Sequence, residues 1–181
     1  RTAAAGVWVQ FGGKKLHGAR VRKAHSQALD AFTAAPTDCV PRSAAPAPDL
    51  SPLRPHEVAV LTVTPGFSAA LLDHAAGTCD GIVLRCFGAG TVPDSPALRA
   101  ALRKAQDGNV LVVAVSQCAE GGMQIGTYAA GKALRDSGAV DGGQMTPEMA
   151  FVKIQFALSQ QSDFDALQRY LATDQCGEMA V

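Results

Sequence analysis

The sequence predicts an α/β protein whose carboxyl-terminal part is a three-layer domain built on a parallel sheet, preceded by a β-hairpin. Three observations support this fold class. Hydrophobic residues make up 48% of the chain and charged residues 18%, which allows a packed core. After residue 56, short apolar runs alternate with helical stretches, as in β-α-β units with right-handed crossovers. The run at 110–115 is continuously apolar, which is typical of a strand buried on both faces.

The N-terminal part is predicted to be a hairpin followed by a linker. Residues 7–11 are strand-forming, Gly12 and Gly13 favour a tight turn, and the chain returns at 14–17. The polar residues 20–32 carry no predicted element, with Leu29 and Phe32 as anchors. Residues 36–55 are rich in proline, which fixes φ and lacks an N–H donor. We therefore divide the chain into an N-terminal remnant (1–35), a linker (36–55) and a C-terminal domain (56–181).

The C-terminal elements follow from apolar runs and from residues that start or stop helices. In the first helix, Ser68 is a candidate cap, Leu71 and Leu72 are expected to face inward, and Gly77 to end it. Asp94 or Ser95 caps the second helix, and Thr146 caps the fourth. Strands are predicted at 58–64, 81–85 and 110–115, and helices at 67–76, 96–107, 127–137, 147–159 and 164–173.

Charge and cysteine content argue against several classes of protein. Lys+Arg and Asp+Glu are both 16, whereas a nucleic-acid-binding protein normally has a basic excess. The one basic cluster is expected to be a solvated hairpin edge; it comprises Lys14, Lys15, Arg20, Arg22 and Lys23.

Five cysteines without a C-x-x-C pair favour neither a disulfide framework nor a zinc site, so we expect reduced thiols, no metal and no cofactor. No apolar run approaches the roughly 20 residues of a membrane span. The chain begins at Arg1 without a methionine, and we expect a preceding segment.

Two loops after predicted strands form the candidate site, because ligands of parallel sheets bind beyond the carboxyl ends of the strands. The first loop, 85–93, has Pro93 at the third glycine position of a dinucleotide fingerprint, which argues against that function. In the second loop, 116–122, Cys118 has no histidine nearby in sequence and is not expected to be a nucleophile. Arg85 at a strand end is either a carboxylate anchor or a partner of Glu120 or Asp94.

Several motifs in these loops and beyond them resemble one known family. Residues 81–93 (GIVLRCFGAGTVP) are similar to a segment of bacterial-type L-asparaginases of the cytosolic, type I branch. The resemblance continues in order along the chain, through 9–11 (VQF), 17–23 (HGARVRK), 30–32 (DAF), 113–118 (VAVSQC), 128–134 (YAAGKAL), 142–150 (GGQMTPEMA) and 177–179 (GEM).

The resemblance implies the C-terminal part of a two-domain cytoplasmic amidohydrolase that converts asparagine and water into aspartate and ammonia. The family's catalytic threonines, Asp and Lys belong to a larger N-terminal α/β domain, and none of their motifs occurs in this chain. The resemblance further implies a homodimer or homotetramer in which the loop carrying Gly90 and Thr91 completes a neighbour's substrate site. Arg85, Ser116 and Cys118 are implied to bind an asparagine effector.

Two departures from the family pattern weaken the prediction of the substrate. The family has Asn where this chain has Thr91 and Ala19. A relative that hydrolyses glutamine or another amide, including a subunit of a tRNA-dependent amidotransferase, is one alternative. A stand-alone effector-binding or assembly module without catalysis is another.

Overall fold

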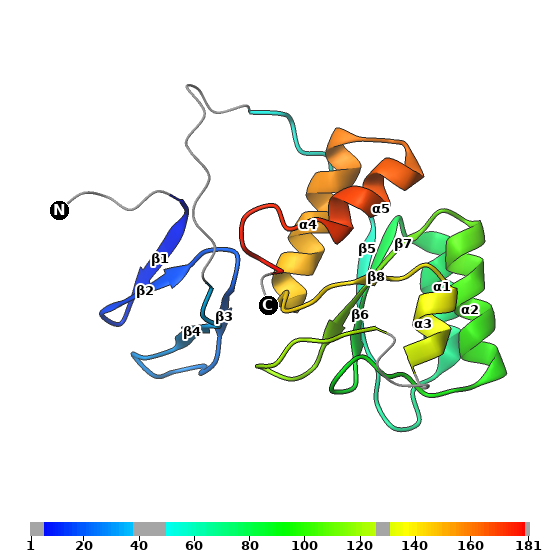
Figure 1. Ribbon diagram of the computed structural model, residues 1–181, viewed down its shortest axis with the longest axis horizontal. Coiled ribbons are helices and arrows are strands. Elements are labelled where there is room, and N and C mark those ends of the chain that lie inside the picture. The colour runs from blue at the N-terminus through cyan, green and yellow to red at the C-terminus, as the bar shows by residue number, and fades with distance from the viewer. Residues whose placement is uncertain (1–5, 38–49, 126–130, 180–181) are drawn as a thin grey trace.

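Two small antiparallel sheets form the N-terminal part of the protein (Figure 1), in a computed structural model that describes residues 6–37, 50–125 and 131–179. The predicted hairpin is confirmed as β1 (Trp8–Phe11) paired with β2 (Lys14–His17). A second pair, β3 (Val21–Lys23) with β4 (Phe32–Ala34), lies where no element was predicted. The rings of Phe11 and Phe32 meet edge to face at 4.9 Å and join the two sheets. Leu29 is 87% exposed, so the prediction that it anchors this part is wrong.

A four-stranded parallel sheet forms the C-terminal part, as predicted. Its strands lie in the order β5 (Val58–Thr62), β6 (Gly81–Cys86), β7 (Leu111–Ser116) and β8 (Val140–Asp141). The predicted strands correspond to β5, β6 and β7. The two-residue β8 was not predicted, because so short a segment carries no periodic signal.

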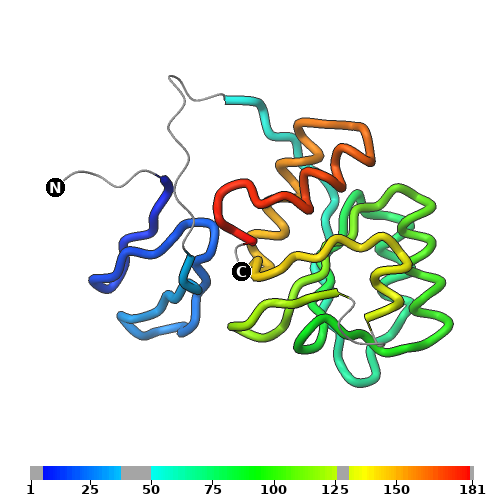
Figure 2. Tube along the Cα trace, viewed as in Figure 1, coloured from blue at the N-terminus to red at the C-terminus, as the bar shows by residue number. Residues whose placement is uncertain are grey.

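Helices cover both faces of this sheet, which makes three layers (Figures 1 and 2). One face carries α1 (Ala69–Thr78), α2 (Pro96–Asp107) and α3 (Lys132–Asp136). The other carries α4 (Pro147–Gln160) and α5 (Phe164–Ala172). Side chains alternate along β6: Leu84 and Cys86 pack toward α1 and α2, while Val83 packs toward α4. This alternation decides which side chains share a pocket at the end of the sheet.

The helix ends mostly follow the predicted caps. Ser95 accepts a hydrogen bond from the Leu98 amide, and Thr146 accepts one from the Met149 amide. Ser68 occupies the N-cap position of α1 without a side-chain hydrogen bond.

Two predictions about α1 and its surroundings are wrong, and others lie partly outside the described residues. The helix continues through Gly77 and ends at Thr78. Of the two leucines predicted to face inward, Leu72 is buried against the sheet, whereas Leu71 is 57% exposed. In the helix predicted at 127–137, residues 127–130 lie outside the described part. Most of the predicted linker, 38–49, does as well, so the domain division stays a prediction.

Glycine substitutions should test the packing of this domain. A Cβ on Gly142 would lie 2.8 Å from Val115 Cγ1 and even closer to the rigid carbonyl of Ala114. Gly142→Ala should therefore destabilise the fold by about 1–3 kcal/mol in urea denaturation. Gly77→Ala is the matched control: it lies inside α1, where its Cβ would meet only the flexible end of Lys104. That change should stabilise the fold by about 0.5–1 kcal/mol. Equal effects of the two changes would contradict this account.

Candidate functional site

A tight loop at the carboxyl end of β6 carries the two residues predicted to contact substrate, Gly90 and Thr91. Phe87 and Thr91 face each other as an antiparallel bridge, with the Phe87 amide donating to the Thr91 carbonyl at 2.9 Å. Gly90 lies between them, buried and with φ at 100°, and a Cβ there would lie 2.8 Å from the Met123 methyl group. Gly88 is exposed and Thr91 is half-buried. Hydrogen bonds within the loop and from neighbouring residues therefore define its shape.

Ser116 ties this loop to the loop after β7. Its hydroxyl donates to the Gly88 carbonyl at 2.7 Å and accepts from the Cys118 amide at 3.0 Å. The adjacent Gln117 side chain donates to the carbonyls of Val63, at 2.6 Å, and Arg85, at 3.0 Å. These bonds fasten the carboxyl ends of three strands to one another. Gln117 was not predicted to take part, because an amide side chain after a strand has no distinctive pattern.

The predicted effector residues do not all lie on one face of the sheet. Ser116 and Cys118 lie together, joined by the hydrogen bond just described. In the β6–β7 register Ser116 is opposite Cys86, whereas Arg85 is opposite Val115. Since neighbouring positions point to opposite faces, Arg85 points to the α4 face and Ser116 to the face covered by α1 and α2.

Arg85 has almost no polar contact for its guanidinium group. One Nη donates to the Thr62 hydroxyl at 3.3 Å, and the buried Nε has no partner among the described residues. Neither Glu120 nor Asp94 bonds to Arg85 in the part of the chain that the structure describes; Asp94 pairs with Arg99. Beside Arg85 lies a cavity of about 530 Å³ that also involves Arg22 from β3. A second recess, next to Ser116 and Cys118, is also lined by Arg22.

Arg20 contradicts the prediction that the basic cluster is a solvated edge, because it is only 2% exposed. Its Nε donates to the Ala35 carbonyl at 3.1 Å, and one Nη donates to the Gly177 carbonyl at 2.9 Å. The other Nη donates to the Gln144 side-chain oxygen. Carbonyl and amide oxygens satisfy the guanidinium group, which explains how a charged side chain is buried there. Arg20 thereby joins the N-terminal strands to the C-terminal domain.

A buried ion pair holds the segment to which Arg20 binds. Lys153 of α4 and Glu178 lie 2.7 Å apart, with side-chain exposures of 1% and 0%. Lys153 also donates to the carbonyls of Leu171 and Thr173 at the end of α5. Glu178 accepts from the backbone amides of Gln175 and Cys176. Burial alone would raise the pKa of Glu178, but the hydrogen bonds from Lys153 and the backbone outweigh it and lower the pKa to about 2.

Two other thiols are poorly suited to nucleophilic chemistry. Burial, followed by the nearby Asp141, raises the pKa of Cys86 to about 12. Desolvation and the adjacent Glu178 carboxylate raise the pKa of Cys176 to about 12 as well. Both thiols therefore stay protonated at neutral pH. Among residues 6–37, 50–125 and 131–179, no three His, Cys, Asp or Glu side chains gather as metal ligands. None of the helices described there is long and apolar enough to cross a membrane.

The Lys153–Glu178 pair should make the free energy of unfolding depend on pH in the acidic range. The pKa of Glu178 is lower in the folded protein than the ordinary 4.5 of the unfolded chain. Its stabilisation is therefore complete above pH 4.5 and is lost as the pH falls toward 2. Glu178→Gln should lower the free energy of unfolding at pH 7 by about 3–5 kcal/mol, because Lys153 loses its buried partner. The difference between the variant and the parent should shrink in urea denaturation below pH 4.5.

The control for this prediction is the exposed pair of Lys14 and Asp30, whose atoms lie 2.6 Å apart. Asp30→Asn should change the free energy of unfolding by less than about 1 kcal/mol, because solvent screens an exposed pair. A Glu178→Gln variant as stable as Asp30→Asn at pH 7 would refute the structural role of the buried pair.

Comparison with known proteins identifies relatives for this arrangement. Residues 57–171 match the family model described as the Glutaminase/Asparaginase C-terminal domain. L-asparaginase 1 of Escherichia coli (strain K12) is 29% identical over 188 residues, which cover 96% of this chain and 56% of the relative. A glutamyl-tRNA(Gln) amidotransferase component from Methanobrevibacter smithii is 32% identical over 123 residues, 67% of this chain and 28% of that protein.

A solved structure agrees with these sequence matches. The crystal structure of L-asparaginase I from Vibrio cholerae superposes with a TM-score of 0.83 at 27% identity, over 96% of this chain and 57% of that one. The chain therefore spans a little over half the length of the asparaginases that it matches.

Proposed function

Because the chain belongs to the Glutaminase/Asparaginase C-terminal domain family, we propose that it is part of an L-asparagine amidohydrolase. In this proposal the full-length enzyme converts asparagine and water into aspartate and ammonia in the cytoplasm. In this proposal the catalytic threonines that the family resemblance implies belong to another part of the full-length enzyme, so no residue of this chain is assigned a catalytic role.

The extent of the sequence match carries this proposal. The match to the E. coli L-asparaginase covers 96% of the chain and so includes the N-terminal strands as well as the α/β domain. The match to the archaeal amidotransferase component covers 67%. Arg20 connects these N-terminal strands to the α/β domain, so the wider match includes both sides of the contact. This favours an asparaginase over part of an amidotransferase.

The loop after β6 has the shape for a contact between subunits. Gly88 is exposed, and the bridge between Phe87 and Thr91 holds the loop at the carboxyl end of β6. In a homodimer or homotetramer, the loop that carries the buried Gly90 and the half-buried Thr91 would complete the substrate site of a neighbouring subunit, with the Thr91 hydroxyl as the contacting group. A hydroxyl can both donate and accept, so it can bind the amide or the carboxylate of a substrate.

An amino-acid effector site is the second function that we propose. Ser116 and Cys118 lie together at the carboxyl end of β7. Arg85, one residue before the end of the neighbouring strand β6, points to the opposite face and has a buried Nε without a partner among the described residues. Effector binding without catalysis by this chain would fit the same features. Ammonia release by the full-length protein distinguishes an asparaginase from a binding module without catalysis.

We expect the 181-residue chain alone to release no ammonia from asparagine or glutamine, whereas the full-length product of its gene hydrolyses asparagine. In that enzyme Thr91→Val should raise the KM for asparagine by up to about tenfold, because a neutral hydrogen bond contributes roughly 0.5–1.5 kcal/mol. Thr78→Val is the control, since Thr78 ends α1 and bonds only to the His74 carbonyl and the Cys79 sulfur within the described residues.

Two results would count against the proposal. Ammonia release by the purified 181-residue chain above a buffer blank would show that it contains its own catalytic residues. A full-length product that hydrolyses neither amide would leave the effector-binding module as the function of this domain.

A further inference from the structure

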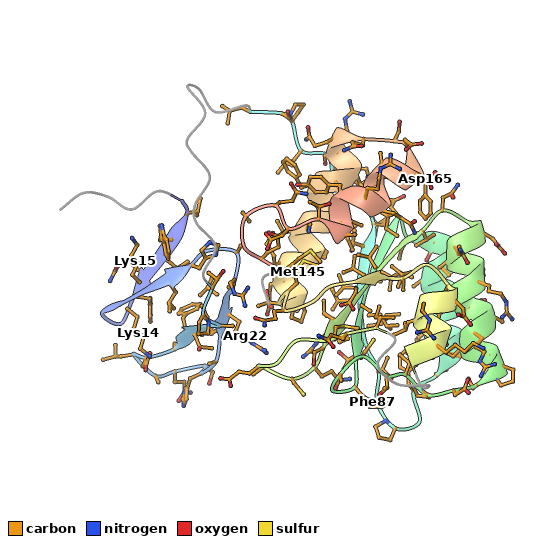
Figure 3. All side chains as sticks on the ribbon, in the orientation of Figure 1. Lys14, Lys15, Arg22, Phe87, Met145 and Asp165 are labelled. Carbon is orange, nitrogen blue, oxygen red and sulfur yellow. The ribbon has the colours of Figure 1, made fainter. Side chains whose placement is uncertain are left out.

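A recess between α2 and α3 lies on the face of the sheet opposite the Arg85 cavity. It has a volume of about 390 Å³ and is lined by residues of the two helices and of the turns that adjoin them. Side chains with nitrogen and oxygen ends gather on these helices, at the end of the molecule away from Lys14 and Lys15 (Figure 3). Among the described residues, it shares no lining residue with the two recesses that Arg22 lines. The recess is therefore separate from the effector residues.

The helical spacing places charged side chains along both walls of this recess. Arg99 and Arg103 are four residues apart on α2, and Lys132 and Asp136 are four residues apart on α3. Residues four apart lie on one side of a helix, so each pair follows one wall. All four residues line the recess, as does Asp94. The recess thus brings together three cationic side chains and two carboxylates.

Only one of the three cations has a bonded partner. Arg99 Nε donates to Asp94 Oδ1 at 2.7 Å, and one Nη of Arg99 pairs with the same carboxylate. Within the part of the chain that the structure describes, Arg103, Lys132 and Asp136 form no ion pair or hydrogen bond through their side chains. Two cations on different helices therefore share one recess without a bonded anion, beside a carboxylate without a bonded donor.

An anion between Arg103 and Lys132 would relieve their mutual repulsion and accept charge-assisted hydrogen bonds from both. A phosphate monoester has a charge of about −1.5 to −2 at pH 7 and three acceptor oxygens, so it can bind cations that approach from two helices. A carboxylate has one charge and two oxygens, which a single guanidinium group occupies. A phosphate monoester therefore fits this position better than a carboxylate.

Asp136 adds a requirement for a hydrogen-bond donor in the ligand, because an ionised carboxylate only accepts. An ammonium group on the ligand would be repelled by the nearby side chains of Arg103 and Lys132, whereas a hydroxyl group would not. The complementary ligand thus combines a phosphate group with a hydroxyl group.

We propose that this recess binds a small phosphate monoester with a free hydroxyl group, the phosphate on Arg103 and Lys132 and the hydroxyl on Asp136. Ligand sites in proteins have volumes from about 300 Å³ upward, so the recess accommodates a small molecule of this kind. Arg99, held by Asp94, forms the adjoining part of the wall with its charge balanced. The proposal goes beyond the asparaginase function. It uses neither amide hydrolysis nor the effector residues, so each of the two proposals can fail alone.

Isothermal titration calorimetry of the 181-residue chain tests the proposal with α-glycerophosphate, inorganic phosphate and glycerol, at an ionic strength held constant with chloride. α-Glycerophosphate should bind with a Kd below about 1 mM, and glycerol should not bind. Inorganic phosphate should bind at least about fivefold more weakly than the ester, because it does not reach Asp136 as well. Arg103→Gln and Lys132→Gln should each weaken binding of the ester at least about tenfold. Asp136→Ala should remove the preference for the ester over inorganic phosphate.

Lys104→Gln is the matched control for the loss of one positive charge. Lys104 follows Arg103 on α2, but its ammonium group is bonded to Asp73 at 2.8 Å and does not line the recess. This change should alter the affinity for α-glycerophosphate by less than about twofold, because solvent and salt screen charges outside the site. Circular dichroism should show that all four variants keep the fold.

Four outcomes would overturn the proposal. α-Glycerophosphate could fail to bind at about 10 mM, or inorganic phosphate could bind as tightly as the ester. The Arg103 and Lys132 variants could bind the ester as tightly as the parent protein does. Finally, Lys104→Gln could weaken binding as much as Arg103→Gln, which would show a general attraction of anions to a basic surface instead of a site.

Discussion

The buried ion pair between Lys153 and Glu178 fixes the segment on which the two parts of the molecule meet. Lys153 donates to the end of α5 as well as to Glu178, and Glu178 accepts two backbone amides of the C-terminal turn. This turn presents the Gly177 carbonyl to Arg20. Replacing only one member of this ion pair would strongly destabilise the fold, since the remaining charge would be buried without a partner. The N-terminal strands are thus positioned by contacts that begin in α4.

The position of these strands explains where the candidate sites lie. Because Arg20 is fixed, Arg22 is held over the end of β6, beside the unsatisfied group of Arg85. On the other face, Ser116 joins the glycine loop after β6 to the loop after β7. The end of the sheet therefore has two chemically different faces, and Arg22 lines a recess on each. One carries the charged side chains beside Arg85, and the other carries the hydrogen-bonded loop after β6.

Much of the fold could be predicted from the sequence, because buried strands leave continuous apolar runs and helices have recognisable caps. Thr146 and Ser95 cap their helices as predicted. Leu71 could not be distinguished from Leu72 without knowing which side of α1 meets the sheet. Arg20 was predicted to be solvated because a basic cluster is normally exposed. Its partners Gly177 and Gln144 lie far along the chain, and local sequence carries no signal for them.

The candidate site was predictable in its location but not in its arrangement. Loops at the carboxyl ends of parallel strands are adjacent in any such sheet. Whether Arg85 and Ser116 share a face depends on the register between β6 and β7, which pairs Cys86 with Ser116. A shift of one residue would have placed them on the same face. Register is a property of the packed sheet, so these residues could be named from the sequence but not placed.

Hydrogen exchange of an Arg20→Met variant tests most directly whether this arginine holds the two parts together. The account predicts that amides of β1–β4 lose protection, while those of β6 and β7 exchange as slowly as in the parent protein, because the sheet keeps its own core. The Lys153–Glu178 pair lies outside the change and should keep the C-terminal turn in place. Unchanged protection in β1–β4, or an equal loss in β6 and β7, would contradict the central role of Arg20.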